Sequence, residues 1–238
     1  LSLTRIEAIQ TQVSGVIETE VFVHGAVCFS YSGRCAISDY LTGFRANHGE
    51  CKHPCRWKYT LMEEKRPGEY MPVFEDDRGL YLFHNKDLAL YEFIPAMADA
   101  GVRSFKIEGR MKSIHYIAST VAFYRQVIDG HHYTKEQAGA LLGRIPNRGY
   151  STGFMAGAIT ADDYSLERSG TQGTAKFVGN VCDCDSQGRC IVEVRNTMQP
   201  GDILEVLTPD GQLSTVTLPD PLFNQHGRVL DVANNTQF

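Results

Sequence analysis

The spacing of hydrophobic residues over the first 150 positions alternates between a helical and a strand period. Residues 3–13 carry apolar side chains near helical spacing, which predicts a helix, whereas residues 19–24 are mostly β-branched or aromatic, which favours a strand. The same patterns predict helices over 86–99, 113–129 and 134–143 and a strand over 102–107. Helices that alternate with strands are typical of an α/β domain.

Helical periodicity disappears after about residue 150, and short strand patterns separated by turn residues take its place. The residues between these strands are rich in Asp, Ser, Gly and Pro, which tight turns favour. Strands are expected at 174–181, 190–196, 203–208 and 213–218. We therefore predict an α/β domain over 1–150 and a small all-β barrel module over 151–238.

Composition places the chain among globular proteins. It has 238 residues, of which 42% are hydrophobic and 21% charged, and this excludes disorder of the whole chain. No run of 18 apolar residues occurs, so neither a transmembrane helix nor a membrane partner is expected.

Charge is divided unevenly along the chain. Residues 1–150 hold 18 Lys and Arg against 17 Asp and Glu, whereas residues 151–238 hold 5 against 11. A strongly basic footprint for nucleic acid is therefore absent, and only the segment 43–58 is locally basic. The acidic module is poorly suited to contact RNA phosphates.

The seven cysteines fall into two groups, and the first group predicts a metal or cluster site. Cys28, Cys35, Cys51 and Cys55 have six, fifteen and three residues between them, on a predicted loop that follows a strand. Four thiolates on one loop can bind structural zinc or an iron–sulfur cluster, and the wide first gap favours the cluster. An odd number of cysteines argues against a secreted disulfide framework, so we expect a reducing, cytoplasmic location.

The second group flanks a predicted hairpin turn and consists of Cys182, Cys184 and Cys190. A second metal site is one alternative there, but we expect unpaired thiols on strands. Three histidines near the first group are expected to be structural, because four cysteines already complete a ligand set. These are His24, His48 and His53.

Residues 20–38 resemble the signature of the peptidase U32 family. The matching positions are Glu20, Phe22, Gly25, Ala26, Cys28, Gly33, Cys35 and Ser38. The resemblance continues through 47–57, 104–113 and 147–154 and into the C-terminal module, so it covers nearly the whole chain. Within the family, the layout is most similar to the branch named for tRNA 5-hydroxyuridine modification.

This resemblance implies a fold, a cofactor and a reaction. The fold would be the C-terminal portion of a TIM-like barrel followed by a small all-β barrel module. Hydroxylating members carry a [4Fe–4S] cluster, and the tRNA branch depends on prephenate as co-substrate to convert wobble uridine to 5-hydroxyuridine. The implied partners are tRNA, prephenate and proteins that transfer electrons or deliver the cluster. The cluster ligands would be Cys28, Cys35, Cys51 and Cys55.

A substrate pocket beside the cluster is expected where the strand at 102–107 ends. Glu108 and Arg110 are the candidate catalytic residues, and they would share an edge with Cys28 if the two strands are parallel. Arg110 and Lys112 are the candidates to bind prephenate, because a guanidinium group pairs with carboxylates in a bidentate manner. A simple pairing of Glu108 with Arg110 remains open as the alternative.

RNA contacts are expected in the locally basic segment. Arg45, Arg56 and Lys58 could meet phosphates, and Trp57 or Tyr59 could stack on a base. For Trp57 we expect a place in the core instead.

Two other functions compete with hydroxylation. The family name implies a peptidase of collagenase type, but the sequence lacks Gly-x-Ser-x-Gly and His-Glu-x-x-His motifs. A Cys28 thiolate that binds iron also could not serve as a nucleophile. The third function is a non-catalytic scaffold or docking protein.

Length adds a further expectation. The residues ahead of the module number about 150, whereas a complete (β/α)8 barrel takes about 250. We therefore expect a chain without the first strands of the barrel.

Overall fold

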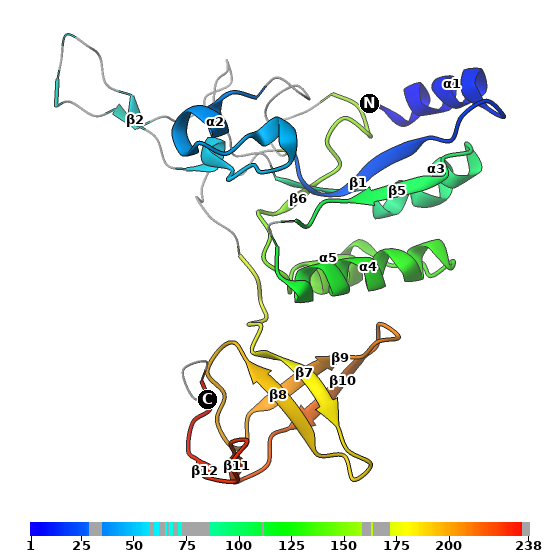
Figure 1. The fold of residues 1–238 in the computed structure, drawn as a ribbon. Coiled ribbons are helices and arrows are strands. Elements are labelled where there is room, and N and C mark those ends of the chain that lie inside the picture. Colours follow the sequence, from blue (N-terminus) through cyan, green and yellow to red (C-terminus); the bar gives the residue numbers. More distant parts are fainter. Residues whose placement is uncertain are drawn as a thin grey trace. The chain divides into compact units, whose positions relative to one another are not determined.

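The computed structural model describes residues 1–28, 35–57, 60–61, 65, 67–68, 71–72, 86–110, 112–158, 163 and 172–234. They form a mixed α/β protein that contains several small sheets (Figure 1). The chain divides into two compact units. The first is built from 1–110 and 146–172, and the second from 111–145 and 173–238.

The first unit is organised around a four-stranded sheet with the order β5-β1-β4-β6. Strand β1 is parallel to β5 and antiparallel to β4, and β4 is parallel to β6. The elements of this unit are α1 (Leu3–Val13), β1 (Glu20–Ala26), α2 (Ile37–Thr42), the 3-10 helices η1 (Ala46–His48) and η2 (Pro54–Arg56), β2 (Thr60–Leu61), β3 (Met71–Pro72), β4 (Asp87–Ala89), the 3-10 helix η3 (Tyr91–Phe93), α3 (Ile94–Asp99), β5 (Ser104–Ile107) and β6 (Tyr150–Ser151).

The first helix and the first strand form where the hydrophobic pattern predicts them. The Ser2 side chain accepts a hydrogen bond from the N–H of Arg5 and caps α1, and Ile6 is buried. The Gln10 amide donates to the Thr19 hydroxyl at 2.5 Å, which ties the helix to the start of β1. Val23 in the middle of β1 is fully buried. Both predictions are confirmed.

The predicted helix over 86–99 is wrong in its first part. Asp87–Ala89 form β4, in which Leu88 lies opposite Gly25 of β1. Only Ile94–Asp99 is an α-helix, and it carries a proline in its first turn. Pairing with β1 supplies backbone partners that decide the conformation of β4, and a local hydrophobic period cannot anticipate such a distant partner.

The second unit combines two helices with three antiparallel hairpins. Strand β7 pairs with β8, β9 with β10, and β11 with β12. None of the helices in the described parts of the chain is long and apolar enough to cross a membrane. The elements of this unit are α4 (Ile114–Ile128), α5 (Lys135–Leu142), β7 (Gly179–Cys184), β8 (Cys190–Val194), β9 (Ile203–Leu207), β10 (Leu213–Thr217), β11 (Leu222–Phe223) and β12 (Val229–Leu230).

Contacts between α4 and the second hairpin hold this unit together. A Cβ atom added to Gly211, in the turn between β9 and β10, would lie 2.9 Å from the Cβ of Ala122 on α4. The Gln126 side chain also donates to the Gly211 carbonyl at 3.4 Å. In addition, Arg144 forms an ion pair with Glu205 of β9. The unit therefore joins segments that are separated in the chain, and the domain boundary near residue 150 stays a prediction.

Neither unit contains a closed barrel among the described residues. The sheet of the first unit is open, with β5 and β6 at its edges, and the hairpins of the second unit remain two-stranded sheets. A barrel requires each strand to pair on both sides. The helices and sheets of the described residues confirm the α/β class. The TIM-like barrel and the small β-barrel are not observed among them.

A histidine in the second unit predicts a pH-dependent stability. The His115 ring stacks on Phe177, with 5.5 Å between centroids and 10° between planes. Burial lowers the pKa of His115 below its ordinary value of 6.5, and the positive charge of Arg144 lowers it further. Because the folded protein favours the neutral ring, stability should fall as the pH drops below 6.5 towards the pKa of the folded state.

Thermal unfolding followed by circular dichroism between pH 7.5 and pH 5.5 measures this effect. His115→Phe retains a ring against Phe177 but cannot bind a proton, so its melting temperature should fall less than that of the parent protein. Replacement of the exposed His226 by asparagine serves as the control and should keep the parent's pH dependence. Identical pH profiles for the parent and His115→Phe would contradict the prediction.

Candidate functional site beside strand β1

Two parallel strands deliver residues to one edge of the sheet in the first unit. Because β1 and β5 are parallel neighbours, the residues after Ile107 leave on the same side as those after Ala26. The N–H of Glu108 donates to the His24 carbonyl at 2.9 Å, which extends the pairing beyond β5. The strands therefore have the parallel arrangement that a shared edge for Cys28 and Glu108 requires.

Gly25 brings the two strands into close contact at this edge. Its φ is +122°, and a Cβ atom at this position would lie only 2.6 Å from the carbonyl oxygen of Glu108. Only glycine combines this backbone conformation with such a close approach. Glu108 is therefore held against Gly25, which lies three positions before Cys28.

The exposed Arg110 reaches from this edge to the segment that carries the cysteines. Its backbone N–H donates to the Glu108 carboxylate at 3.1 Å, and no ion pair joins the two side chains. One guanidinium nitrogen lies 2.7 Å from the point that a Cβ on Gly49 would occupy. Gly49 precedes Cys51 by two residues, so the guanidinium lies against the cysteine segment and is accessible to an anion.

Lys112, the other predicted ligand for prephenate, belongs to the second unit. Its ammonium group lies 4.7 Å from the centroid of the Tyr116 ring. This cation–π contact gives the ammonium a partner within its own unit. A role for Lys112 towards an anionic ligand stays a prediction, as do the roles of Glu108 and Arg110.

The segment 35–57 belongs to the predicted long loop and contains short helices. Helix α2 contacts η2, and Pro54 and Ser38 are fully buried. The Ser38 hydroxyl accepts a hydrogen bond from the N–H of Lys52 at 3.3 Å, which joins α2 to the residue after Cys51. Helix α2 ends at Gly43, whose left-handed φ of 71° turns the chain.

The four predicted cluster ligands differ in exposure. Cys28 is exposed, and Cys35, Cys51 and Cys55 are half-buried. The N–H of His53 donates to the Cys51 sulfur at 3.3 Å. Cysteine sulfurs are the ligands that iron–sulfur clusters and zinc use in proteins.

The described residues do not assemble a metal site. No group of three His, Cys, Asp or Glu side chains among them is placed to hold a metal ion. Residues 29–34, which connect Cys28 to Cys35, lie outside the described residues. The donor set therefore fits a cluster in its chemistry, and cluster and zinc binding both stay predictions.

The predicted RNA-contacting residues are only partly described. Arg45 is exposed, and its N–H donates to the Glu50 carboxylate at 3.3 Å. Arg56 belongs to η2, whereas Lys58 and Tyr59 lie outside the described residues. Trp57 is 48% exposed, so its expected place in the core is wrong. The short helix η2 ends at Trp57 and leaves the ring at the surface.

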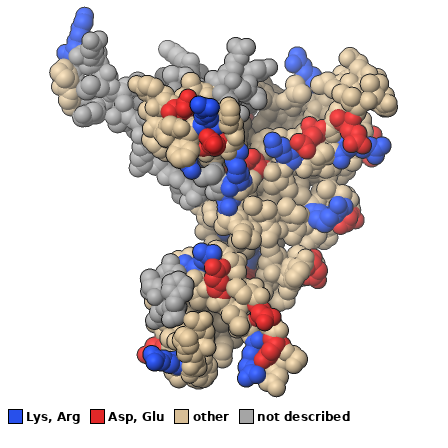
Figure 2. Space-filling model, viewed as in Figure 1, with Lys and Arg blue, Asp and Glu red and all other residues tan. Residues whose placement is uncertain are grey.

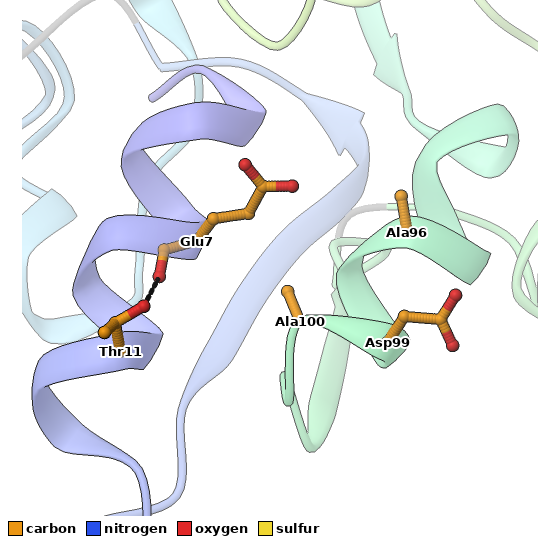
Figure 3. Close-up of a pocket in the computed structure, with 5 residues that line it drawn as sticks. All are labelled: Glu7, Thr11, Ala96, Asp99 and Ala100. Atoms are coloured by element: carbon orange, nitrogen blue, oxygen red, sulfur yellow. Dashed lines mark hydrogen bonds between the residues drawn. The ribbon is translucent and has the colours of Figure 1, made fainter.

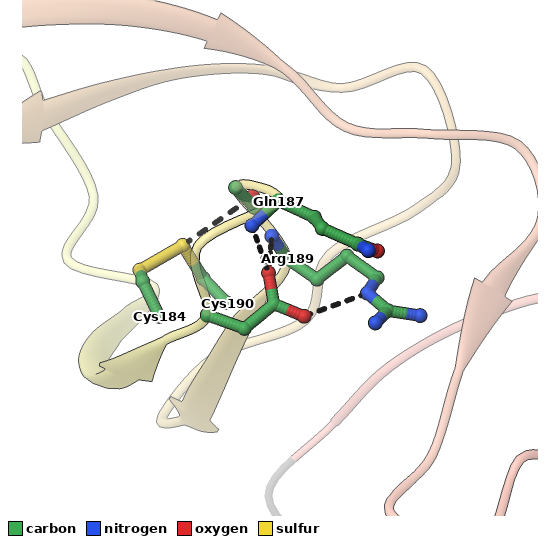
Figure 4. Close-up of polar contacts among 6 residues, drawn as sticks. Cys184, Gln187, Arg189 and Cys190 are labelled. Atoms are coloured by element: carbon green, nitrogen blue, oxygen red, sulfur yellow. Dashed lines mark hydrogen bonds and ion pairs between the residues drawn. A yellow bond between two sulfur atoms is a disulfide. The ribbon is translucent and has the colours of Figure 1, made fainter.

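The C-terminal cysteines are arranged differently from the expectation. Cys184 and Cys190 lie opposite each other at the end of the β7–β8 hairpin and form a disulfide (Figure 4). Cys182 is an exposed free thiol. The Asp185 carboxylate accepts hydrogen bonds from the N–H groups of Gln187 and Arg189 and pairs with the Arg189 guanidinium. The prediction of unpaired thiols is therefore wrong for Cys184 and Cys190, because the register of the hairpin places them opposite each other.

A surface pocket between α1 and α3 contains none of the predicted site residues (Figure 3). Its lining has two carboxylates and otherwise small side chains, and it offers no thiol and no cation. The residues are Glu7, Thr11, Ala96, Asp99 and Ala100. The pocket is therefore not a candidate for the predicted chemistry.

Comparison with known families identifies the chain. The family model described as peptidase family U32 matches residues 1–164, and the model of the U32 C-terminal domain matches residues 173–238. The chain belongs to peptidase family U32. The resemblance of the cysteine signature is thereby confirmed at the level of the family.

Relatives of this U32 chain carry two kinds of name. It is 34% identical to tRNA hydroxylation protein P of Escherichia coli over 98% of this chain and 60% of that protein. It is 35% identical to tRNA hydroxylation protein P1 of Bacillus subtilis over 92% of this chain and 53% of that protein. It is also 42% identical to an uncharacterized protease of Methanocaldococcus jannaschii, over 65% of this chain and 38% of that protein.

The chain spans about 60% or less of the length of these relatives. No solved structure matches it. The activity and the partners of a whole protein are therefore matters for a proposal.

Other exposed residues of the segment 35–57 were not predicted from the sequence. Tyr40 and Phe44 are exposed, and the ammonium of Lys52 lies 4.3 Å from the centroid of the Phe44 ring. Two aromatic residues four positions apart beside basic residues could have drawn attention to them. Their exposure, however, depends on which face of α2 is buried, and the six-residue helix is too short to show a clear period.

Proposed function

We propose that this U32 chain takes part in the hydroxylation of wobble uridine in tRNA to 5-hydroxyuridine, with prephenate as co-substrate. The observation that carries the proposal is the contact of the exposed Arg110 guanidinium with Gly49, beside Cys51. A site for a dicarboxylate would then lie next to the thiols. The match to two tRNA hydroxylation proteins over more than nine-tenths of the chain supports the choice of tRNA.

The cofactor in this proposal is a [4Fe–4S] cluster held by Cys28, Cys35, Cys51 and Cys55. Such a cluster would supply one-electron chemistry. The hydrogen bond from the His53 N–H to the Cys51 sulfur would orient this ligand. Proteins that deliver electrons or the cluster are proposed as further partners, and zinc in the same four-cysteine site is the alternative.

The chain's own residues would bind and orient the co-substrate. Arg110 would hold a carboxylate of prephenate in a bidentate pair, and Lys112, which belongs to the second unit, stays a predicted ligand. Glu108 orients the backbone of Arg110 through its hydrogen bond, and Gly25 permits the approach that places Glu108 there. Arg45, Arg56 and Lys58 would contact tRNA phosphates.

The proposal also includes the fold of the whole protein. Strands β1 and β5 are parallel neighbours with α3 in the connection between them, which is the arrangement of a βαβ unit. Such units are the repeating element of a TIM-like barrel. The antiparallel pairing of β4 with β1 departs from an all-parallel barrel. We therefore propose that the parallel pair of β1 and β5 alone is part of such a barrel.

Nucleoside analysis tests the proposed reaction. Removal of the gene that encodes this chain should eliminate 5-hydroxyuridine and its derivatives from tRNA, and a restored copy should return them. Mass spectrometry of digested tRNA measures these nucleosides. Unchanged nucleoside levels in the deleted strain would contradict the proposal.

Proteolysis is the second candidate, and the name of the archaeal relative favours it. The purified protein and its Cys28→Ala variant should both leave casein and gelatin intact. Cleavage that accompanies the protein through purification would favour the peptidase.

A further inference from the structure

The surface of α2 and the residues after it expose aromatic rings that a folded protein would ordinarily bury. Tyr40 is 87% exposed, Phe44 43% and Trp57 48%. Aromatic side chains contribute large apolar areas, and exposed apolar area is typical of binding sites. All three belong to the segment 35–57, which also carries three of the predicted cluster ligands.

Cations accompany these rings. The ammonium group of Lys52 lies 4.3 Å from the centroid of the Phe44 ring, and Arg45, the next residue after Phe44, is exposed. The backbone of Lys52 is fixed by the hydrogen bond from its N–H to the buried Ser38. In Figure 2, blue Lys and Arg atoms lie beside red Asp and Glu atoms over the region labelled α2 in Figure 1.

The charges of the segment favour an anionic partner. Residues 35–57 contain Arg45, Lys52 and Arg56 against Asp39 and Glu50, and the Arg110 guanidinium adds a further positive charge at Gly49. A ring with an ammonium over one face leaves its other face for a ligand that alternates flat apolar groups with negative charges. Unpaired nucleotides have this composition, whereas the bases of a duplex are stacked on one another and cannot reach a ring.

We infer that Tyr40 and Phe44 form a stacking platform for unpaired nucleotides of an RNA loop, with Lys52 and Arg45 against the flanking phosphates. This inference rests on the proposed function, because it takes tRNA as the RNA. Stacking accepts any base, so the platform would hold the loop beside the cysteine segment without selecting its sequence. Recognition of the target uridine would then belong to the residues around Arg110.

Binding measurements with the full-length protein test the platform. The ligand is a fluorescein-labelled, unmodified tRNA transcript with uridine at the wobble position, followed by anisotropy under anaerobic conditions. The double variant Tyr40→Ala/Phe44→Ala should bind it at least about 10-fold more weakly, because stacking of one base on one ring contributes about 1–3 kcal/mol. Tyr40→Phe, which keeps a ring, should stay within about 2-fold of the parent.

Two controls separate stacking from a general loss of structure. Phe223 in the second unit is 61% exposed, and Phe223→Ala should leave tRNA affinity unchanged. The double variant should also retain the parent's circular dichroism spectrum and iron content. If the double variant is misfolded, Tyr40→Ala alone decides, because a side chain that is 87% exposed contributes little to packing.

A second pair of ligands tests whether the platform binds unpaired nucleotides. A short RNA hairpin with an open loop should lose affinity in the double variant, and an unbroken duplex of the same length should not. Wild-type affinity of the double variant for tRNA, or equal losses for hairpin and duplex, would overturn the inference. So would a double variant that binds RNA normally but loses binding to anionic lipid vesicles.

This test is separable from the proposed function. If the deleted strain keeps its 5-hydroxyuridine, hydroxylation is wrong, whereas the binding data still decide whether the platform stacks RNA. If the double variant binds normally while the deleted strain lacks 5-hydroxyuridine, only the platform is wrong.

Discussion

Replacing Cys51 with serine should abolish binding of the proposed cluster and, with it, formation of 5-hydroxyuridine. A serine hydroxyl is not deprotonated near neutral pH and does not replace a thiolate ligand. The variant also loses the sulfur that accepts the His53 N–H. Loss of a residue that only supports a ligand costs about 10–100-fold in affinity or activity, so loss of a ligand should lower activity by at least about 100-fold.

Iron and sulfide analysis of anaerobically purified protein, with its visible spectrum, measures the first effect, and nucleoside analysis of tRNA measures the second. Cys182→Ser is the matched control, because Cys182 is a free thiol outside both the disulfide and the predicted ligand set. It should keep full iron content and activity. A Cys51→Ser protein with undiminished iron, or a parent protein that contains zinc instead, would exclude the proposed cluster.

Gly25→Ala should destabilise the first unit, because two effects add at this position of β1. The backbone φ of +122° is unfavourable for alanine, at a cost of about 1–3 kcal/mol. The new Cβ would also lie 2.6 Å from the Glu108 carbonyl oxygen, and overpacking of this kind costs about 1–3 kcal/mol. Relief of the contact would displace Glu108 and, through its hydrogen bond, Arg110.

Urea unfolding followed by circular dichroism gives the change in the free energy of unfolding, with an expected loss of about 2–6 kcal/mol. Gly15→Ala is the matched control. Its φ is +77°, but nothing lies within 4 Å of the added Cβ, so only the backbone cost of about 1 kcal/mol is expected. Equal losses in the two variants would show that the close approach of β1 to Glu108 contributes nothing.

Much of the secondary structure could be predicted, because local sequence decides it. Helix α4 begins at Ser113, whose side chain accepts from the Tyr116 N–H, and α5 begins with a capping box formed by Thr134 and Gln137. These signals lie within a few residues of the elements they start. Strand β4 was predicted as part of a helix, because its partner β1 lies about 60 residues earlier in the chain.

The candidate site was predictable in its chemistry but not in its arrangement. Four cysteines on one segment indicate a metal or cluster site from spacing alone, and the family match confirms the signature that contains them. The contact of Arg110 with Gly49 joins residues about 60 positions apart, and no pattern in the sequence indicates it. Exposure of Trp57 and Tyr40 depends in the same way on which faces of two short helices pack together.

The sequence by itself determined the family, the α/β class and the positions of most helices and strands. All of these follow from residue types and short-range spacing. The tertiary structure alone decided the parallel pairing of β1 with β5, the close approach at Gly25, the disulfide between Cys184 and Cys190 and the exposed rings of α2. Each of these depends on segments distant in the chain or on the burial of one face, and both are settled only when the chain packs against itself.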